Sequence, residues 1–345
     1  MVNDLNSGAT DRVNGFWSSS ERCQDTRATQ VGAQQLGMRV MVDAALRKGK
    51  KRPGSFWVFV GPFFIGLIVF TYVPILWGFI LSFCQAVNTV TPTRFVGLDN
   101  YAALVSSPTF QSAMVTGVLF AVFVVPVSFA GALGLALLVH RLPVGSGLFR
   151  TIFFLPAACS YVLGCLVWRL ALFNGLPFGF ANTVIGIGGA APVAWIGTEP
   201  LYWLVIVTVR LWLQLGGFMI IFLAGLSDIP RQYYEAAQVD GASTWQSFRH
   251  ITVPLLRNSS VAIGLLLIIA AFQAFDEFYN IFQSGESFGI TAYPAETPLV
   301  FLFQIAFKAG DYGAGSAGTF LLTGLLLVCV IIPARRLRFG QEERG

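Results

Sequence analysis

Charged side chains are scarce in this sequence. They make up 11% of its 345 residues, whereas apolar side chains make up 55%. Soluble domains carry roughly a quarter charged residues, so a chain of this composition cannot present a hydrated surface on all sides. The composition therefore predicts a protein that lies mainly in lipid. The excess of 22 basic over 17 acidic residues then reports orientation across the membrane, and nucleic-acid binding is not needed to explain it.

Residues that could form a catalytic or metal site are also few. The two histidines, His140 and His250, lie near no second set of metal-type ligands, and the five cysteines form no CxxC pair. The only Gly-Lys pair, Gly49-Lys50, lies in a basic run with no strand before it, so the phosphate-binding loop GxxxxGK[ST] is missing. The sequence predicts no catalytic residue, no metal site, no cofactor on this chain and no ATP hydrolysis by it.

Six apolar runs follow one another along the chain, each near the roughly 20 residues that cross a bilayer as a helix. They are Phe56–Phe83, Ala113–Val139, Ile152–Phe173, Leu201–Leu226, Val261–Phe282 and Ala314–Ile332. An even number of spans places both termini on one side of the membrane. The segments on that side are rich in arginine, whereas the other side carries only Arg94 and Lys308. Because basic loops stay in the cytoplasm, we predict an all-α, multi-pass membrane protein with both termini cytoplasmic.

Polarity divides the chain into three parts. Residues 1–52 are polar, end in a basic cluster and are predicted to be a largely disordered cytoplasmic tail. Residues 53–338 hold the six spans and include a long polar loop at residues 227–257. Residues 339–345 are predicted to be a short cytoplasmic C-terminal tail.

The polar loop has the pattern of two short helices joined at a hinge. Pro230 suits a first helical position, and Gly241 stands where the first helix must end, since glycine takes a positive φ without a Cβ clash. Ser243 and Gln246 fit a capping box that starts a second helix, and Pro254 is expected to end it. The pattern predicts a protruding hairpin that a soluble partner could grip.

The same loop resembles a known family. It reads Glu235-Ala236-Ala237, three residues, Gly241, nine residues, Ile251, one residue, Val253-Pro254. This spacing is similar to the EAA loop of binding-protein-dependent ABC importer permeases, and the surrounding residues resemble the sugar-uptake branch, the maltose and glycerol-3-phosphate types. Stretches elsewhere resemble the family in its own order: RFVGLDNY (94–101), LFRTIFFLP (148–156), FLAGLSDIP (222–230) and FQAFDEFYN (272–280).

The resemblance implies the type I ABC importer permease fold, a six-helix bundle whose polar loop docks on a separate ATPase. The residues implied to make this contact are Glu235, Ala236, Ala237, Asp240, Gly241, Trp245 and Phe248. The chain would form half of the pathway for a sugar or sugar-like solute in a bacterial inner membrane. The implied partners are a second homologous permease subunit, two ATP-binding subunits that hold ATP and Mg²⁺, and an extracytoplasmic solute-binding protein.

Polar residues inside the fourth and fifth apolar runs are candidates for the solute pathway, because exposing them to lipid is costly. Within each run they recur at helical spacing and so share one face, except that Tyr279 lies beside the face of the fifth run. The candidates are Arg210, Gln214 and Gly217 in the fourth run, and Gln273, Asp276, Tyr279 and Asn280 in the fifth. Arg210 is expected to face the pathway and to pair with Asp276 or Glu277, which would leave donors for solute hydroxyls. Alternatively, these polar groups satisfy one another between helices and never touch the solute.

Other interpretations remain open at this point. The solute could be glycerol-3-phosphate or a related polyol phosphate, and the chain could be a polytopic receptor or scaffold that recruits a cytoplasmic enzyme without transport. Trp168 and Arg169, near the outer end of the third run, are expected to anchor the protein at the membrane interface.

Overall fold

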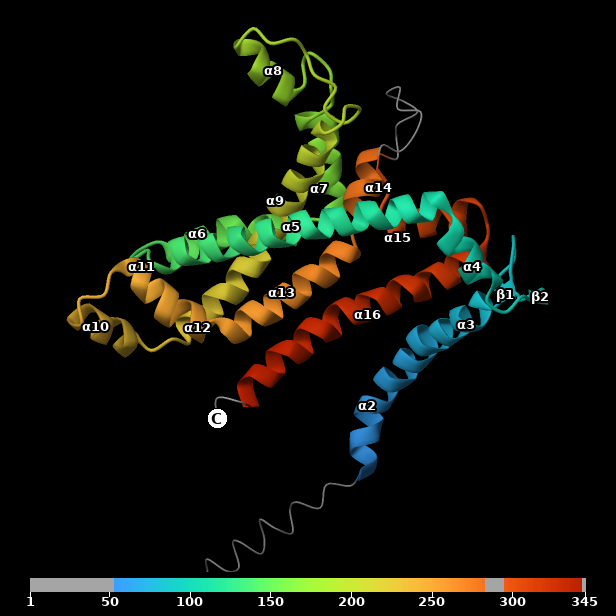
Figure 1. Cartoon of the computed structure of the whole chain (residues 1–345), viewed down its shortest axis with the longest axis horizontal. Coiled ribbons are helices and arrows are strands. Elements are labelled where there is room, and N and C mark those ends of the chain that lie inside the picture. Colours follow the sequence, from blue (N-terminus) through green and yellow to red (C-terminus); the bar gives the residue numbers. More distant parts are fainter. Residues whose placement is uncertain (1–52, 283–294, 343–345) are drawn as a thin grey trace, which may run out of the picture. The chain divides into compact units, whose positions relative to one another are not determined.

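The computed structural model describes residues 53–282 and 295–342. These residues are mostly helical (Figure 1), and the sheet among them is one antiparallel ribbon of two strands, β1 (Cys84–Gln85) and β2 (Arg94–Phe95). The chain divides into two compact units, one ending at Pro74 and one beginning at Ile75. The predicted tail at residues 1–52 lies outside the described residues.

The helices follow in sequence order. They are α2 (Pro53–Leu67), η1 (Ile68–Tyr72), α3 (Val73–Ser82), α4 (Asp99–Ser106), α5 (Pro108–His140), α6 (Ser146–Phe154), η2 (Leu155–Ala158), α7 (Tyr161–Val167), η3 (Trp168–Leu172), α8 (Phe180–Ile187), α9 (Leu201–Ser227), α10 (Arg231–Val239), α11 (Thr244–Ser247), η4 (Phe248–Thr252), α12 (Val253–Leu255), α13 (Arg257–Phe272), α14 (Asp276–Phe282), α15 (Pro298–Phe303), η6 (Gln304–Lys308) and α16 (Tyr312–Glu342). Helix α16 thus continues into the predicted C-terminal tail.

The predicted spans are found, and two of them are broken. Within residues 53–282 and 295–342, five helical stretches are long and apolar enough to cross a membrane, and a sixth is obtained if α6–η2 and α7–η3 form one span. Those two parts meet at 93°. Pro156 has no N–H to continue the helical ladder, and Cys159 and Ser160 are extended. The third span is therefore not the straight helix that its apolar run predicts.

The fifth span is broken between α13 and α14. The chain leaves the helix at Gln273 and resumes it at Asp276. Gln273 is exposed and lies in the break, whereas Asp276 and Asn280 lie on α14. The helical spacing predicted for these three residues is therefore interrupted after Gln273. The short helices α4, α8 and α15 were not predicted, since none is a long apolar run.

Two buried clusters form the interior of the larger unit. The first joins α5, α9 and α14, where the rings of Phe120 and Phe278 meet edge to face with centroids 5.1 Å apart. The second joins α5, α9 and α13 around Phe222 and Ile263, with small residues such as Ala132 on α5. The first cluster borders the break in the fifth span and the second borders the polar loop, so each supports one candidate site.

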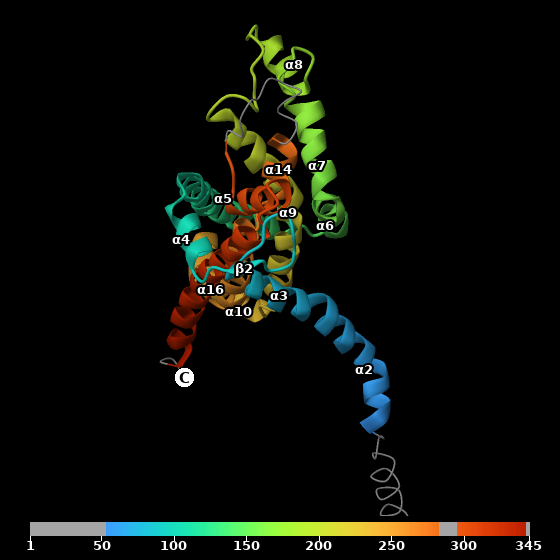
Figure 2. The same ribbon diagram turned by 90° about the vertical axis from the view of Figure 1, so that its right-hand side faces the viewer.

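Close helix contact seats the bent third span against α9 (Figure 2). A Cβ added at Gly216 would overlap the backbone carbonyl oxygen of Phe153, whereas one added at the neighbouring Gly217 would meet nothing within 4 Å. Only glycine fits at the first position, so backbone touches backbone there.

Candidate functional site

The polar loop folds as the sequence predicts at its hinge. Helix α10 ends at Val239, and Gly241 follows with a φ of +74°. The predicted capping box is present: the Ser243 hydroxyl accepts from the Gln246 N–H at 3.3 Å, and the Gln246 side-chain oxygen accepts from the Ser243 N–H at 2.7 Å. These contacts satisfy two otherwise orphan donors at the start of the second helix.

Two predicted boundaries of the loop are displaced. Pro230 precedes α10 as its extended N-cap residue, and the helix begins at Arg231. Pro254 does not end the second helix, because α11, η4 and α12 run without interruption to Leu255. The helix ends one residue after the proline, at Leu255.

A tyrosine–threonine contact fastens the loop back on itself. The Tyr234 hydroxyl lies 2.9 Å from the Thr252 hydroxyl, joining α10 to the end of the second helix. Thr252 is buried, and so is the neighbouring Leu256, which belongs to the second cluster. The hairpin is therefore held from its base, and its tip projects (Figure 1).

The predicted ATPase-contact residues lie on the outer surface of this hairpin. Glu235, Ala236, Asp240, Gly241 and Trp245 are exposed, and Ala237 and Phe248 are half-buried. The Trp245 ring is 66% exposed and leans on Phe248, with centroids 5.4 Å apart. An exposed tryptophan supported by a second ring is a common anchor of protein interfaces.

A hollow of about 370 Å³ lies at the hinge. It is lined by Ala237, Asp240, Gly241, Ala242, Gln246, Ser247, His250 and Ile251. Three of the predicted contact residues, Ala237, Asp240 and Gly241, thus line this hollow. The hinge therefore carries a small pocket on a hairpin that projects from the bundle.

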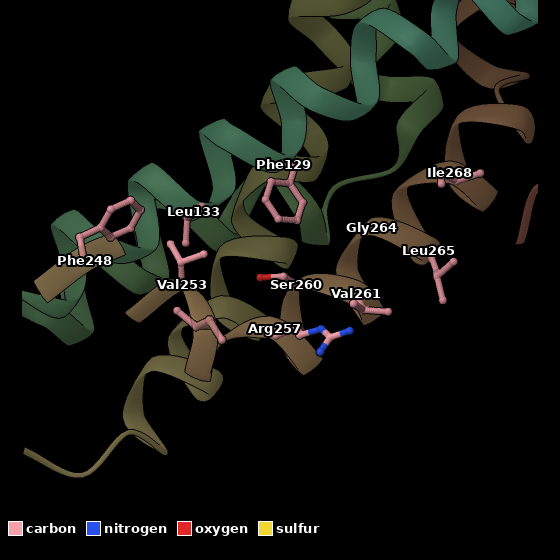
Figure 3. Close-up of a pocket in the computed structure, with 11 residues that line it drawn as sticks. Phe129, Leu133, Phe248, Val253, Arg257, Ser260, Val261, Gly264, Leu265 and Ile268 are labelled. Atoms are coloured by element: carbon pink, nitrogen blue, oxygen red, sulfur yellow. The ribbon is translucent and has the colours of Figure 1, made fainter. Parts of the chain in front are cut away.

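An apolar groove of about 480 Å³ runs from the hairpin along α5 and α13 (Figure 3). Phe129 and Leu133 of α5 form one wall, and Phe248 and Val253 close the end next to the loop. The α13 wall consists of Arg257, Ser260, Val261, Gly264, Leu265 and Ile268, with Leu256 before it. Phe248, which belongs to the loop, thus lines a groove whose other walls belong to the spans.

A buried ion pair marks the second candidate site. Arg210 Nη1 donates to Glu277 Oε1 at 2.6 Å, Arg210 Nε donates to Gln214 Oε1 at 2.8 Å, and Arg210 Nη2 donates to the Ala270 carbonyl at 2.6 Å. The Tyr161 ring lies 5.6 Å from the guanidinium carbon. These groups, which we call the Arg210 joint, bring together α7, α9, α13 and α14.

The joint lies in the interior of this chain. Arg210 is 5% exposed and Glu277 is 1% exposed. An arginine at membrane depth needs such partners because its burial is costly. Of the two predicted carboxylates, Glu277 is the partner and Asp276 is not. All three guanidinium nitrogens are engaged, so the expectation that Arg210 keeps donors for solute hydroxyls is not met in this conformation.

The other predicted pathway residues are distributed around the joint. Gln214 is part of it, and Gly217 faces open space one turn away. On α14, Tyr279 stacks on Phe275 at 4.8 Å, and the Asn280 amide donates to the Asp276 carbonyl at 2.8 Å. The side chains that reach a surface of this chain are therefore on α14 and in the break, not at Arg210.

The interfacial role expected for Arg169 is wrong. This side chain is 7% exposed, and its Nη1 donates to the Asn280 carbonyl on α14 at 3.3 Å. The adjacent Trp168 donates from its indole N–H to the Thr208 hydroxyl at 3.1 Å. Both side chains thus bind neighbouring helices, Arg169 on α14 and Trp168 on α9.

Sequence reasoning missed several residues of the site. Glu277 was considered only as a partner, and Tyr161, Thr297 and the Ala270 carbonyl were not considered. A carboxylate inside an apolar run was a usable signal for Glu277. A backbone carbonyl freed by a helix break has no signal in the sequence. Among the described residues, no group of three or more His, Cys, Asp or Glu side chains could hold a metal ion.

The apolar spans identify a multi-pass membrane protein, with a projecting hairpin and a buried polar joint. Residues 67–339 match the family described as binding-protein-dependent transport system inner membrane component. The chain belongs to this family, whose members are transport subunits of ABC importers.

Characterised relatives cover most of the chain. The arabinooligosaccharides transport system permease AraP of Bacillus subtilis is 31% identical over 80% of this chain and 86% of its own length. The trehalose/maltose permease MalF of Thermococcus litoralis is 30% identical, covering 83% and 94%. The lactose permease LacF of Rhizobium radiobacter is 32% identical, covering 73% and 83%.

A solved structure has the same fold. A bacterial ABC transporter involved in import of the acidic polysaccharide alginate superposes with a TM-score of 0.68 at 20% identity, covering 85% of this chain and 98% of the other. The likeness confirms the type I permease fold that the sequence predicts.

Proposed function

We propose that this chain forms one half of the membrane pathway for a sugar, most simply an oligosaccharide, in an ABC importer. The observation that carries the proposal is that three relatives of 30–32% identity, each matched over most of its length, are named for oligosaccharide or disaccharide uptake. No observation favours a polyol phosphate or a receptor without transport.

The projecting hairpin is proposed as the coupling element. Glu235 and Trp245 are exposed near its tip, and the hinge hollow can accept a side chain from a partner. Two ATP-binding subunits, carrying ATP and Mg²⁺, would dock here. This side would then be the cytoplasmic one, and both termini are proposed to lie on it. Thr252 and Leu256 are buried where the hairpin joins the spans. A displacement of the hairpin tip would therefore be transmitted to α13.

The proposed pathway face lies on α14 and at the break before it. Gln273 is exposed, and Asp276, Tyr279 and Asn280 are partly so. Amide, carboxylate and aromatic groups are suited to sugar hydroxyls and ring faces. Arg210 and Gln214 are proposed to organise this face, and Gly217 leaves room beside it. A second homologous permease would supply the facing half, and an extracytoplasmic binding protein would deliver the solute.

The experiment is solute uptake by the complete assembly. The permease is co-expressed with the neighbouring permease, ATPase and binding-protein genes and reconstituted in proteoliposomes. A panel of mono-, di- and oligosaccharides is compared with glycerol-3-phosphate, and uptake and ATP hydrolysis are both measured. ATP-dependent uptake of at least one sugar is expected. Uptake of glycerol-3-phosphate alone would refute the sugar assignment.

A further inference from the structure

The break in the fifth span is held from several sides. Arg210 binds the Ala270 carbonyl before the break and the Glu277 carboxylate after it. Inside the break, the hydroxyl of the buried Thr297 donates to the Ala274 carbonyl at 2.7 Å. The carbonyls that a helix break frees would be costly in a membrane if unpaired, and here side chains from α9 and from the start of α15 pair them.

A second arginine binds the far end of α14. Arg169 donates to the carbonyl of Asn280, which lies in the last turn of that helix. A buried guanidinium that donates to this carbonyl ties η3 to α14. Each half of the broken span therefore has an arginine on one of its backbone carbonyls: Arg210 on Ala270 of α13, and Arg169 on Asn280 of α14.

Arg210 uses its donors to hold three helices in place and does not form the strongest possible ion pair with Glu277. A guanidinium can grip both oxygens of one carboxylate, which is its strongest arrangement. Here it grips one, and Oε2 of Glu277 is buried without a hydrogen-bond partner among the described residues. Leaving an oxygen unpaired costs free energy. The remaining donors instead reach Gln214 and Ala270, so one side chain fixes α9, α13 and α14 together.

We infer that Arg169 and Glu277 are positioning residues for transport. They set the orientation of α14, and with it the placement of Asp276, Tyr279 and Asn280, without touching the solute themselves. This inference rests on the proposed pathway face on α14. Both residues are buried, although Arg169 was expected at the membrane interface, and the inference gives each of them a role in transport.

The test compares the half-saturation constant of uptake with the amount of assembled complex. Arg169→Gln and Glu277→Gln keep much of the side-chain shape and remove the charge. Arg169→Gln is expected to assemble while the half-saturation constant for the imported sugar rises by about tenfold, the equivalent of one misplaced hydrogen bond. Glu277→Gln keeps an oxygen that can accept from Arg210 but leaves the guanidinium without its counter-charge, so part of the complex should be lost, and the half-saturation constant of the complex that assembles should rise similarly. Arg169→Lys should recover part of the loss, because an ammonium still reaches the carbonyl.

The matched control is Trp168→Phe. It removes the neighbouring hydrogen bond to Thr208 on α9 and leaves the contact with α14, so its half-saturation constant should equal that of the wild type. A purely structural role for Arg169 or Glu277 would lower the amount of complex and leave the constant unchanged. That result, or wild-type behaviour of both neutral variants, overturns the inference.

A second readout does not depend on the solute. In a cysteine-depleted complex carrying Gln273→Cys, the rate at which a charged thiol reagent modifies this cysteine measures how accessible the break is. Adding Arg169→Gln or Glu277→Gln should change its modification rate several-fold, and an unchanged rate overturns the inference. Failure of the wild-type complex to import any sugar would count against the proposed function alone.

Discussion

At the scale of single residues, the decisive chemistry is what Arg210 does with its donors. It divides them among a carboxylate, an amide and a backbone carbonyl on three helices. A lone charge at this depth would be expelled or neutralised. The partners therefore explain why an arginine and a glutamate persist within apolar runs.

Replacing Arg210 should show that the buried Glu277 carboxylate needs it as a partner. Arg210→Met leaves a buried carboxylate unpaired, at a cost of about 3–5 kcal/mol, so little complex should be recovered from membranes. Adding Glu277→Leu removes that carboxylate and should restore most of the assembly, though not the half-saturation constant of uptake. Asp276→Leu in place of Glu277→Leu is the control and should give no rescue, since Asp276 does not pair with Arg210. Rescue by the control would contradict the observed pairing.

The hinge glycine provides a second test at this scale. Gly241 has a φ of +74°, which costs a residue with a Cβ about 1–2 kcal/mol. Gly241→Ala should reduce solute-stimulated ATP hydrolysis in proteoliposomes, and Gly241→Asn should reduce it less, because asparagine tolerates this region better. Equal activity of the two variants would show that the hinge geometry is not needed for coupling.

At the scale of elements, breaks matter as much as spans. The third span bends after Pro156, at the extended residues Cys159 and Ser160. The fifth span is interrupted at residues 273–275. The third span packs closely on α9 at Gly216, whereas at the second break other elements supply the partners, Arg210 from α9 and Thr297 from the start of α15. Discontinuous helices inside transporters are tolerated on this condition.

Adjacent glycines on α9 allow a matched experiment. Gly216→Ala would overlap the Phe153 carbonyl and must push the bend away, whereas Gly217→Ala meets nothing within 4 Å. The first variant should lower the melting temperature of the purified complex by several degrees, and the second should leave it unchanged. A similar loss from both would mean that helix propensity, not the close contact, explains the sensitivity.

Sequence reasoning succeeded where a local pattern determines local structure. Apolar length predicted the spans, and Gly241 with Ser243 and Gln246 predicted the hinge and cap. It failed where partners come from distant residues. Nothing near Gln273 shows that Thr297 and Arg210 will satisfy a break, and nothing near Arg169 shows that α14 ends beside it. The roles of the loop and pathway residues stay predictions.

At the scale of the whole molecule, the two sites are joined by α13. This helix begins beside the hairpin at Arg257 and ends at the break under Arg210. A rigid helix between a docking surface and a pathway face can carry a displacement from one to the other. The groove along α13 adjoins Phe248 and lies on the same route.

Coupling should fail when the tip of the hairpin is altered. Glu235 is exposed and contributes nothing to the interior, so Glu235→Ala should leave the complex assembled. Loaded binding protein should then stimulate ATP hydrolysis and uptake far less than in the wild type. Gln232→Ala, also exposed on α10, is the control expected to retain coupling. Normal stimulation in the Glu235 variant would remove the hairpin from its proposed role.

The right-angled third span also has a consequence for how the protein is made. Neither of its two parts reaches the roughly 20 apolar residues that cross a bilayer alone. The surface that seats the bend, at Gly216, is synthesised later, because it belongs to α9. The third span is therefore expected to settle into the membrane only after the fourth has left the ribosome. A chain truncated before Leu201 should leave this segment accessible to a protease that cannot cross the membrane.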